Sequence, residues 1–431
     1  RSVILRAPLS DPTCVLANTL AAFFVATRDP VKARAFLSAA AESLEKKGTG
    51  YEKLVFKAVY CLVGDGRDEE AAVDRHFELI KEFPKDLVSL KRAQLLCFYL
   101  GRPDISLNLA EQVLPQNQDQ SYIYGLLAFP LLELGRMAEA EKAARKGFEI
   151  NKFDLWSQHN LCHVFQYDCR FKEAVDFMES CSYTWSSCSS FMFTHNWWHV
   201  AVCYLEGHSP LHKVLEIYDN CIWKELERKD AEHSEVYVNA IGLLLQIEVR
   251  GHKSCIEEQI MVLANIFENE SIWHMEWLLD ILGLWALACK KESAKADDLL
   301  ESMKSRISQM SKKKQHSMQR GRKLAEAIYE YGRGNHQKAL DALGLDFDVT
   351  KCKVIGASDE QLDVFNEVWY CVLLSCGHTL KAIEEIEKAL KTREGAPFLW
   401  RLLERAYALE GVEKANVVAE KARTLETAYF K

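Results

Sequence analysis

The fold is decided by the stretch from Asp119 to Asn151, which reads DQSYIYGLLAFPLLELGRMAEAEKAARKGFEIN. Its first half is an apolar helix pattern that ends at Leu134-Gly135-Arg136, and its second half is an amphipathic helix pattern. Apolar residues recur at helical spacing, and glycine commonly ends a helix. Small residues let neighbouring helix backbones approach closely, and they stand here at Gly125, Ala140 and Ala144. The stretch therefore predicts two helices joined by a tight turn.

The same turn recurs along the chain at a nearly constant spacing. A small residue followed by arginine begins at Gly66, Gly101, Gly135 and Cys169, and the spacings are 35, 34 and 34 residues. A fixed period of this length is typical of repeat proteins, and with small packing residues it resembles the tetratricopeptide repeat. The predicted fold class is all-α: a right-handed superhelical α-solenoid of tetratricopeptide-like helix pairs.

The array is predicted to be a single solenoid over residues 1–431, with roughly ten helix pairs. Regular repeats are expected over about 50–206, irregular helix pairs over about 207–344, and C-terminal helices over about 359–428. Within the irregular part the pattern predicts helices at 211–226, 232–249, 255–268, 272–289, 294–310, 316–331 and 336–343. Residues 345–360 are predicted as the longest non-helical connection, and no stretch alternates as a strand would.

Composition limits the class of protein. The chain has 431 residues, a hydrophobic fraction of 48% and a net charge of −8 that is spread along its length, so neither nucleic acid nor a membrane is predicted as a partner. No apolar run reaches the ~18 residues of a membrane span. The 14 cysteines include no CxxC pair, which favours reduced thiols and a cytoplasmic location. Because the sequence begins at Arg1 and not at Met, an N-terminal targeting segment is not observable.

Two histidine pairs are the strongest candidate for a functional centre. His159 and His163 form one pair, His195 and His199 form the other, and the pairs are separated by 36 residues, close to the repeat period. An i, i+4 spacing places both imidazoles of a pair on one helix face. Because the pairs occupy similar positions in successive repeats, we expect the four rings to converge. Counting back 34 residues from His159 gives Gly125, so an imidazole replaces a small packing residue.

Three interpretations of this centre remain open. Four converging nitrogens can bind a metal ion, and imidazole suits Zn, Fe, Cu and Ni without selecting one. Histidines can also act as a catalytic acid and base, since imidazole titrates near neutral pH. The third interpretation is a hydrogen-bonded polar seam between helices, in which Asn160, Asn196 and Gln166 satisfy the ring nitrogens.

Other polar and aromatic residues are candidates for the surroundings of this centre. Asp280 stands in an apolar helix, where an unpaired charge would be costly, so it is predicted to have a partner or a raised pKa. Asp363 stands early in a helix, and both carboxylates are candidate orienting groups for the histidines. A ligand pocket is predicted from Trp156, Asn160, Asn196, Trp198, Asp219 and Gln361.

Several strings resemble the tetratricopeptide-repeat-protein-38 family. They are Trp156-x-x-His159-x-x-x-His163, Thr194-His195-Asn196-Trp197-Trp198-His199, Tyr218-Asp219 and Gln361-x-Asp363-Val364-Phe365-Asn366. The segments Glu82–Leu87 and Gly356–Gln361 are similar to its plant branch. The resemblance covers essentially the whole chain and implies an all-α superhelix, with no settled biochemical activity. It also implies four departures, since other members carry His at Leu282, Asp at Asn239, and Arg at Gln246 and Leu362. If those residues form an ancestral site with the histidines, this chain has lost part of it.

The leading functional prediction is a non-enzymatic interaction scaffold whose histidine-rich centre, on the concave surface, binds a protein or peptide segment or a small-molecule ligand. The alternative is an enzyme of unknown reaction that uses the four histidines for acid–base or metal-assisted chemistry in an enclosed pocket. The cofactor is unknown from the sequence, because the chain has no complete catalytic or phosphate-binding motif that would identify one.

Overall fold

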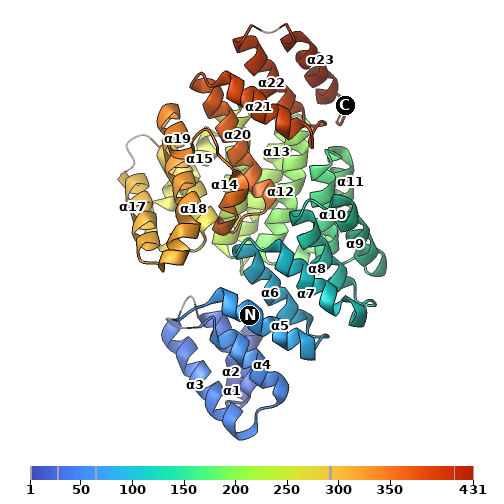
Figure 1. The fold of residues 1–431 in the computed structure, drawn as a ribbon, viewed down its shortest axis with the longest axis vertical. Helices are drawn as coiled ribbons and strands as arrows, with labels where there is room; N and C mark the ends of the chain where they lie inside the picture. Colours follow the sequence, from blue (N-terminus) through green and yellow to red (C-terminus); the bar gives the residue numbers. More distant parts are fainter. Residues whose placement is uncertain (1, 27–28, 64–65, 291–293, 412, 431) are drawn as a thin grey trace. The chain divides into compact units, whose positions relative to one another are not determined.

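Paired helices follow one another along the whole chain in a computed structural model of the protein (Figure 1). The structure describes residues 2–26, 29–63, 66–290, 294–411 and 413–430, and within these ranges it contains helices and turns but no strand. The predicted all-α fold class is thereby confirmed. No helix within these ranges has the length and apolar character that crossing a bilayer requires.

The described chain forms two compact units, residues 1–157 and 158–431, and the boundary falls inside helix α10 (Leu155–Tyr167). The predicted subdivision near 206 and 344 follows repeat regularity and remains an interpretation. The helices of unit 1 are α1 (Ser2–Ser10), α2 (Val15–Val25), α3 (Pro30–Lys47), α4 (Gly50–Tyr60), α5 (Glu69–Glu82), α6 (Leu87–Tyr99), α7 (Pro103–Val113), a 3₁₀ turn (Leu114–Gln116), α8 (Ser121–Glu133) and α9 (Met137–Ile150).

Unit 2 continues from α10 with longer helices and more short turns. Its α-helices are α11 (Phe171–Cys181), α12 (Ser190–Glu206), α13 (Leu211–Ile217), α14 (His233–Val249), α15 (Glu257–Phe267), α16 (Trp277–Cys289), α17 (Ala294–Ser308), α18 (Lys312–Gly332), α19 (His336–Leu343), α20 (Asp359–Ser375), α21 (Thr379–Leu390), α22 (Pro397–Leu409) and α23 (Ala415–Glu426). The 3₁₀ turns are Ser182–Ser187, Trp223–Glu227, Lys253–Cys255, Glu270–Ile272 and Val349–Ile355, and a π turn covers Tyr218–Ile222.

The predicted turns share one backbone conformation. Gly101, Gly135 and Cys169 have φ values of 64°, 73° and 57°, which is the left-handed region. In each turn the following arginine N–H donates to the carbonyl five residues earlier, as in a Schellman cap. Cys169 adopts this conformation without being glycine, at a cost of roughly 1–2 kcal/mol. The turn positions predicted from the spacing at these three sites are confirmed.

Most predicted helices in the irregular part are present, with two informative shifts. The helix expected over 211–226 leaves α-helical geometry at Tyr218, where a π turn brings Tyr218 and Ile222 into the core. The helix expected from 272 begins only at Trp277, because His274 has a φ of 64° and its backbone N–H donates to the Asp280 carboxylate at 2.8 Å. The expected non-helical segment 345–360 contains a 3₁₀ turn.

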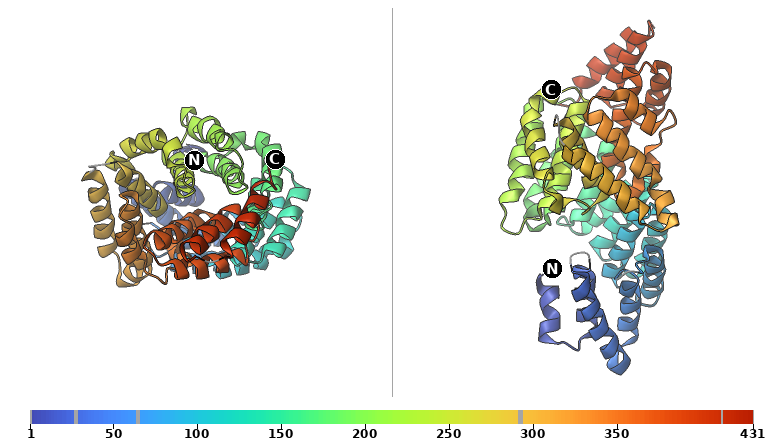
Figure 2. Two further views of the ribbon diagram at one scale, coloured as in Figure 1. Left: turned by 90° about the horizontal axis from the view of Figure 1, so that it is seen from above. Right: turned by 90° about the vertical axis from the view of Figure 1, so that its left-hand side faces the viewer.

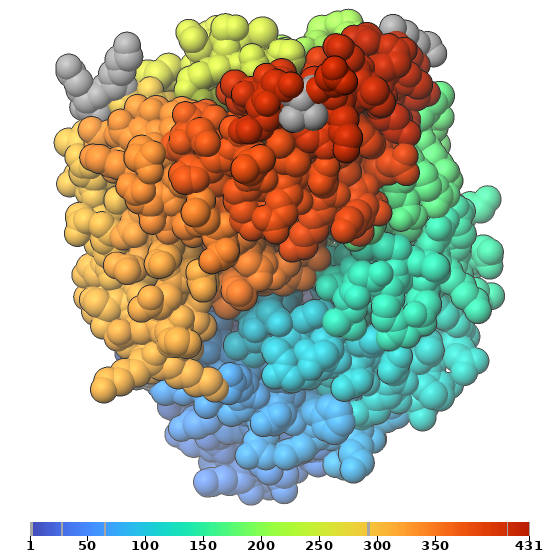
Figure 3. All heavy atoms as spheres, turned by 45° about the horizontal axis from the view of Figure 1, so that its top comes forward, coloured from blue at the N-terminus to red at the C-terminus, as the bar shows by residue number. Residues whose placement is uncertain are grey.

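Unit 2 closes on itself through α20. This helix packs against α14, and the Arg250 guanidinium at the end of α14 donates to both Glu367 carboxylate oxygens of α20 at 2.7 and 2.8 Å. Arg393, after α21, donates to Glu206 at the end of α12 at 2.7 Å. Figure 2 shows these late helices returning to the helices that begin the unit, and in Figure 3 the side chains of α18 to α22 form a continuous surface. Segments that are far apart in sequence therefore enclose the interior of unit 2.

Two helical glycines of unit 2 should respond oppositely to alanine. A Cβ on Gly283 of α16 would overlap the buried Phe267 ring, whereas a Cβ on Gly242 of α14 would meet its nearest atoms at 3.7 Å. We expect Gly283→Ala to lower the free energy of unfolding by about 1–3 kcal/mol. Gly242→Ala should leave it unchanged or raise it by up to about 1 kcal/mol through helix propensity. Urea unfolding of both variants measures the difference, and equal effects would contradict the tight contact at Gly283.

Candidate functional site

The four histidines meet inside unit 2, on two helices that flank α11. His159 and His163 lie on α10, His195 and His199 lie on α12, and one ring nitrogen of each lies within 4.8 Å of the others. The predicted convergence is confirmed. All four side chains are at most 3% exposed. The expectation that they line an open concave surface is therefore wrong, since the return of α20 covers them.

Each imidazole has its Nδ1 atom against a side-chain oxygen, as the following distances show. His159 Nδ1 is 3.1 Å from Asn196 Oδ1, and His199 Nδ1 is 2.8 Å from Gln166 Oε1. His195 Nδ1 is 2.8 Å from Asn239 Oδ1, and His163 Nδ1 is 2.8 Å from Glu360 Oε1. An oxygen acceptor at Nδ1 selects the tautomer that carries its proton there. The Nε2 atoms are therefore the ones left to face the common space.

Two of these tautomers are fixed by independent contacts. Glu360 Oε1 lies 2.8 Å from His163 Nδ1 as an ion pair, and a carboxylate oxygen at this distance favours a proton on that nitrogen. The Asn239 amide nitrogen donates to the Glu235 carbonyl at 3.2 Å and to Thr194 Oγ1 at 2.9 Å, and this leaves its oxygen for His195. His163 and His195 thus both present an Nε2 lone pair when their rings are neutral.

The closest contact within the cluster joins two such nitrogens. His159 Nε2 lies 2.8 Å from His163 Nε2, and the two ring centroids are 4.4 Å apart. Two lone pairs would repel at this distance, so either one ring carries a proton on Nε2, as a neutral tautomer or as an imidazolium, or both nitrogens bind a metal ion. His199 Nε2 is buried and has no hydrogen-bond partner within the described ranges.

The cluster is set in an apolar wall that disfavours protonation. His195 stacks on Phe191 and on Trp198, at centroid distances of 4.8 and 5.2 Å. Burial, together with the neighbouring His163 charge, lowers the pKa of His195 to about 4, and the same causes lower the pKa of His199 well below its usual value. Burial raises the pKa of Glu360, but the positive charge and hydrogen bonding of His163 outweigh it, so that this pKa lies below its usual value.

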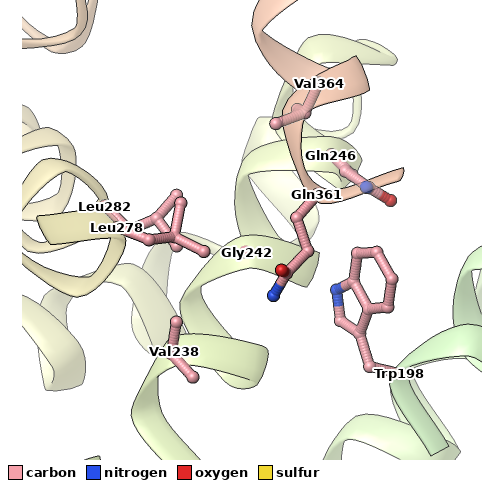
Figure 4. Close-up of a pocket in the computed structure, with 8 residues that line it drawn as sticks. All are labelled: Trp198, Val238, Gly242, Gln246, Leu278, Leu282, Gln361 and Val364. Atoms are coloured by element: carbon pink, nitrogen blue, oxygen red, sulfur yellow. The ribbon is translucent and has the colours of Figure 1, made fainter. Parts of the chain in front are cut away.

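A small pocket, shown in Figure 4, is lined by Trp198, whose ring stacks on His195 of the cluster. Its open volume is about 10 Å³, close to the minimum that holds one water molecule. The buried Gln246 amide oxygen has no hydrogen-bond partner within the described part of the chain. The pocket is lined by Trp198, Val238, Gly242, Gln246, Leu278, Leu282, Gln361 and Val364.

Two of the six predicted pocket residues, Trp198 and Gln361, line this pocket, and Asn196 lies in the cluster against His159. Asn160 is buried in α10. Trp156 belongs to unit 1, where its ring lies 3.2 Å from the Lys91 ammonium and its Cβ would meet a Cβ on Gly125 at 2.6 Å. Asp219 is exposed on the π turn.

The two predicted orienting carboxylates have other partners. Asp280 is fully buried and accepts from His274, both from its backbone N–H and from Nδ1 at 3.0 Å. The prediction that it needs a partner is confirmed, although that partner is outside the four-histidine cluster. Asp363 forms an ion pair with Arg393. The carboxylate that does reach the cluster is Glu360, three residues before Asp363.

Glu360 and Asn239 were not predicted from the sequence as partners of the histidines. An acidic residue in the first turn of a helix is ordinary, so Glu360 carried no distinguishing signal. Three of the four positions at which this chain departs from the family it resembles lie at the cluster or the adjoining pocket. Asn239 hydrogen-bonds to His195, and Gln246 and Leu282 line the pocket. The fourth, Leu362, is fully buried in α20.

No family model matches the chain. Among solved structures it is similar to the human IFIT1 dimer with m7Gppp-AAAA, at a TM-score of 0.38 and 14% identity, over 92% of this chain and 78% of that one. The human IFIT1 dimer with PPP-AAAA gives the same score and identity, over 92% and 79% of the two chains. Likeness of this degree carries no statement about ligand or partner.

The buried histidines predict a pH-dependent stability of unit 2. His195 stays neutral in the folded state down to about pH 4, whereas the unfolded side chain binds a proton below its usual pKa of 6.5. The unfolded state then binds more protons between these values, so stability falls as the pH falls from 6.5 towards 4, by up to about 1.4 kcal/mol per pH unit for each such histidine.

Urea unfolding at pH 7, 6 and 5, with a chelator present, tests this expectation. Tryptophan fluorescence reports mainly on unit 2, because only Trp156 of the ten tryptophans lies in unit 1. The double variant His195→Asn with His199→Gln should show a shallower pH dependence. Equal unfolding midpoints for the unsubstituted protein at pH 7 and pH 5 would contradict the assigned neutral state.

Proposed function

We propose that the protein is a helical-repeat interaction scaffold in which unit 1 binds an acidic partner segment with aliphatic side chains. The observation that carries this proposal is an exposed stripe on α6. Val88, Leu95 and Tyr99 are 65%, 46% and 42% exposed, and their spacing of seven and four residues places them on one helix face. Apolar side chains gathered on one exposed face are a usual feature of a binding surface.

A cation lies in the middle of this stripe. Arg92 stands four residues after Val88 and three before Leu95, and its guanidinium lies 6.0 Å from the Phe23 ring of α2. Its Nη1 atom is buried and has no hydrogen-bond partner within the described ranges, and the Asp86 carboxylate acts on the guanidinium without a hydrogen bond to that atom. Burial lowers the pKa of Arg92, and Asp86 and Tyr51 offset only part of that shift. An acidic group from a partner would therefore stabilise the charged guanidinium further.

The histidine centre is not where we place this partner. Its four imidazoles are buried under α20, so an extended segment does not reach them. The alternative hypothesis, an enzyme of unknown reaction, requires a substrate beside the imidazoles, and the adjoining pocket has room for about one water. Membership of the tetratricopeptide-repeat-protein-38 family remains part of the proposal, supported by the quoted strings and the helix-pair fold.

A displayed library of random peptides, selected on the purified full chain, tests the proposal. We expect enriched peptides to carry Asp or Glu beside Leu, Ile or Val. The charge reversal Arg92→Glu should weaken their binding by at least about tenfold in fluorescence anisotropy. The matched control is Arg75→Glu on α5, since Arg75 is exposed and forms an ion pair with Glu78 of its own helix.

Two results would overturn this function. One is enrichment of peptides without acidic residues, and the other is equal affinity of the Arg92→Glu and Arg75→Glu variants for the enriched peptides. Circular dichroism of both variants verifies that the helical fold is retained, so that lost binding is not lost structure.

A further inference from the structure

We infer that His159, His163, His195 and His199 bind one divalent first-row transition-metal ion, of which zinc fits best, as a closed structural site within unit 2. The inference goes beyond the proposed function and is independent of partner binding by unit 1. The inference rests on the four Nε2 atoms that face one common space and on the oxygen atoms that contact the four Nδ1 atoms.

The nitrogen count distinguishes a metal from a proton. A proton between His159 Nε2 and His163 Nε2 satisfies the 2.8 Å contact but reaches only two rings. His199 Nε2 would stay buried without a partner. His195 would also keep an Nε2 lone pair directed at the cluster, because Asn239 holds its proton on Nδ1. A single metal ion accepts a lone pair from all four nitrogens at once.

The distances allow this with small movements of the side chains. Tetrahedral zinc has Zn–N bonds of about 2.0–2.1 Å, which hold its ligand nitrogens about 3.3 Å apart. The four candidate nitrogens lie within 4.8 Å of one another and the closest pair is at 2.8 Å. The widest pair would have to close by about 1.5 Å and the closest pair open by about 0.5 Å. Rotations of the imidazoles about their χ angles can supply such shifts while α10 and α12 stay in place.

The oxygen atoms next to the four Nδ1 atoms are arranged as they are around the histidine ligands of a metal site. Histidine ligands usually donate their second N–H to a carboxylate or a carbonyl oxygen, which fixes the tautomer and the ring orientation. Three of the Nδ1 atoms hydrogen-bond to such an oxygen, from Asn196, Asn239 and Gln166, and the fourth, of His163, forms an ion pair with Glu360. Glu360 also places a negative charge next to the ion. A polar seam without a metal needs no such uniform orientation.

The ligand set identifies the class of ion and the kind of site. Four neutral imidazoles exclude Mg²⁺ and Ca²⁺, which require oxygen ligands, and favour Zn²⁺, Cu²⁺, Ni²⁺ or Fe²⁺. A site with four protein ligands leaves no open position for a substrate, which is the arrangement of structural zinc sites. The ion would therefore join α10 to α12 and, through Glu360, to α20.

Metal analysis of the purified full chain tests the inference directly. After expression with added zinc we expect about one zinc ion per chain, as in a closed four-ligand site. Removal by a chelator should lower the melting temperature of unit 2, and added ZnCl₂ should restore it. Replacement by Co²⁺ should give the visible absorption of tetrahedral cobalt bound to nitrogen.

Variants separate the cluster from adventitious binding. His199→Gln and His163→Gln should lose the stoichiometric ion and the cobalt absorption. The matched control is His76→Gln, which changes a fully buried histidine of unit 1. Glu360→Gln keeps all four ligands but weakens the acceptor behind His163, so it should retain one ion per chain with an affinity about 10–100-fold lower. This variant remains informative if the ligand variants fail to fold.

Three outcomes would overturn the inference. They are a cooperatively folded chain that takes up no stoichiometric metal from any of the four ions, a chelator that leaves the melting temperature of unit 2 unchanged, and metal binding that survives in His159→Asn with His199→Gln. A peptide-selection result for the Arg92 surface affects none of these measurements.

Discussion

The structure of unit 2 depends on how four imidazoles are held with their Nδ1 atoms outward. Each has an oxygen acceptor at 2.8 to 3.1 Å, and these acceptors come from α10, α12, α14 and α20. The helices are therefore joined by hydrogen bonds that run outward from one centre. The Nε2 atoms are left in the interior of the cluster, and the two that lie 2.8 Å apart need a proton or a metal ion between them. The same contacts that orient the four imidazoles therefore also hold these four helices together.

Helix α20 is the element that turns an open array into a closed unit. Glu360, Asp363 and Glu367 stand three and four residues apart on one face of this helix and pair with His163, Arg393 and Arg250 respectively. Burial raises the pKa of Glu367 to about 7, with Arg250 acting against that shift. Removing one partner of a buried ion pair costs free energy of folding. These pairs therefore favour one position of α20 over others. An open solenoid would need none of these charges in its interior.

Local features of the sequence predicted the repeats well, because their causes are local. Gly101 and Gly135 mark turns that need a left-handed residue, and the arginine after each supplies the capping N–H. The i, i+4 histidine spacing likewise fixes which faces of α10 and α12 meet, given a period near 34. The start of α16 was missed, because His274 and Asp280 form a side-chain cap that replaces an expected helical turn.

What could not be predicted are the contacts made by closure. Glu360 is separated from His163 by almost two hundred residues, and no periodicity in the intervening chain indicates that α20 returns to α10. The consequence is large, because closure converts histidines expected on a binding surface into a buried centre. The return of α20 thus both buries the four histidines and brings the Glu360 carboxylate to His163. Closure places the histidines in the interior of unit 2, whereas the exposed apolar face of α6 around Arg92 belongs to unit 1.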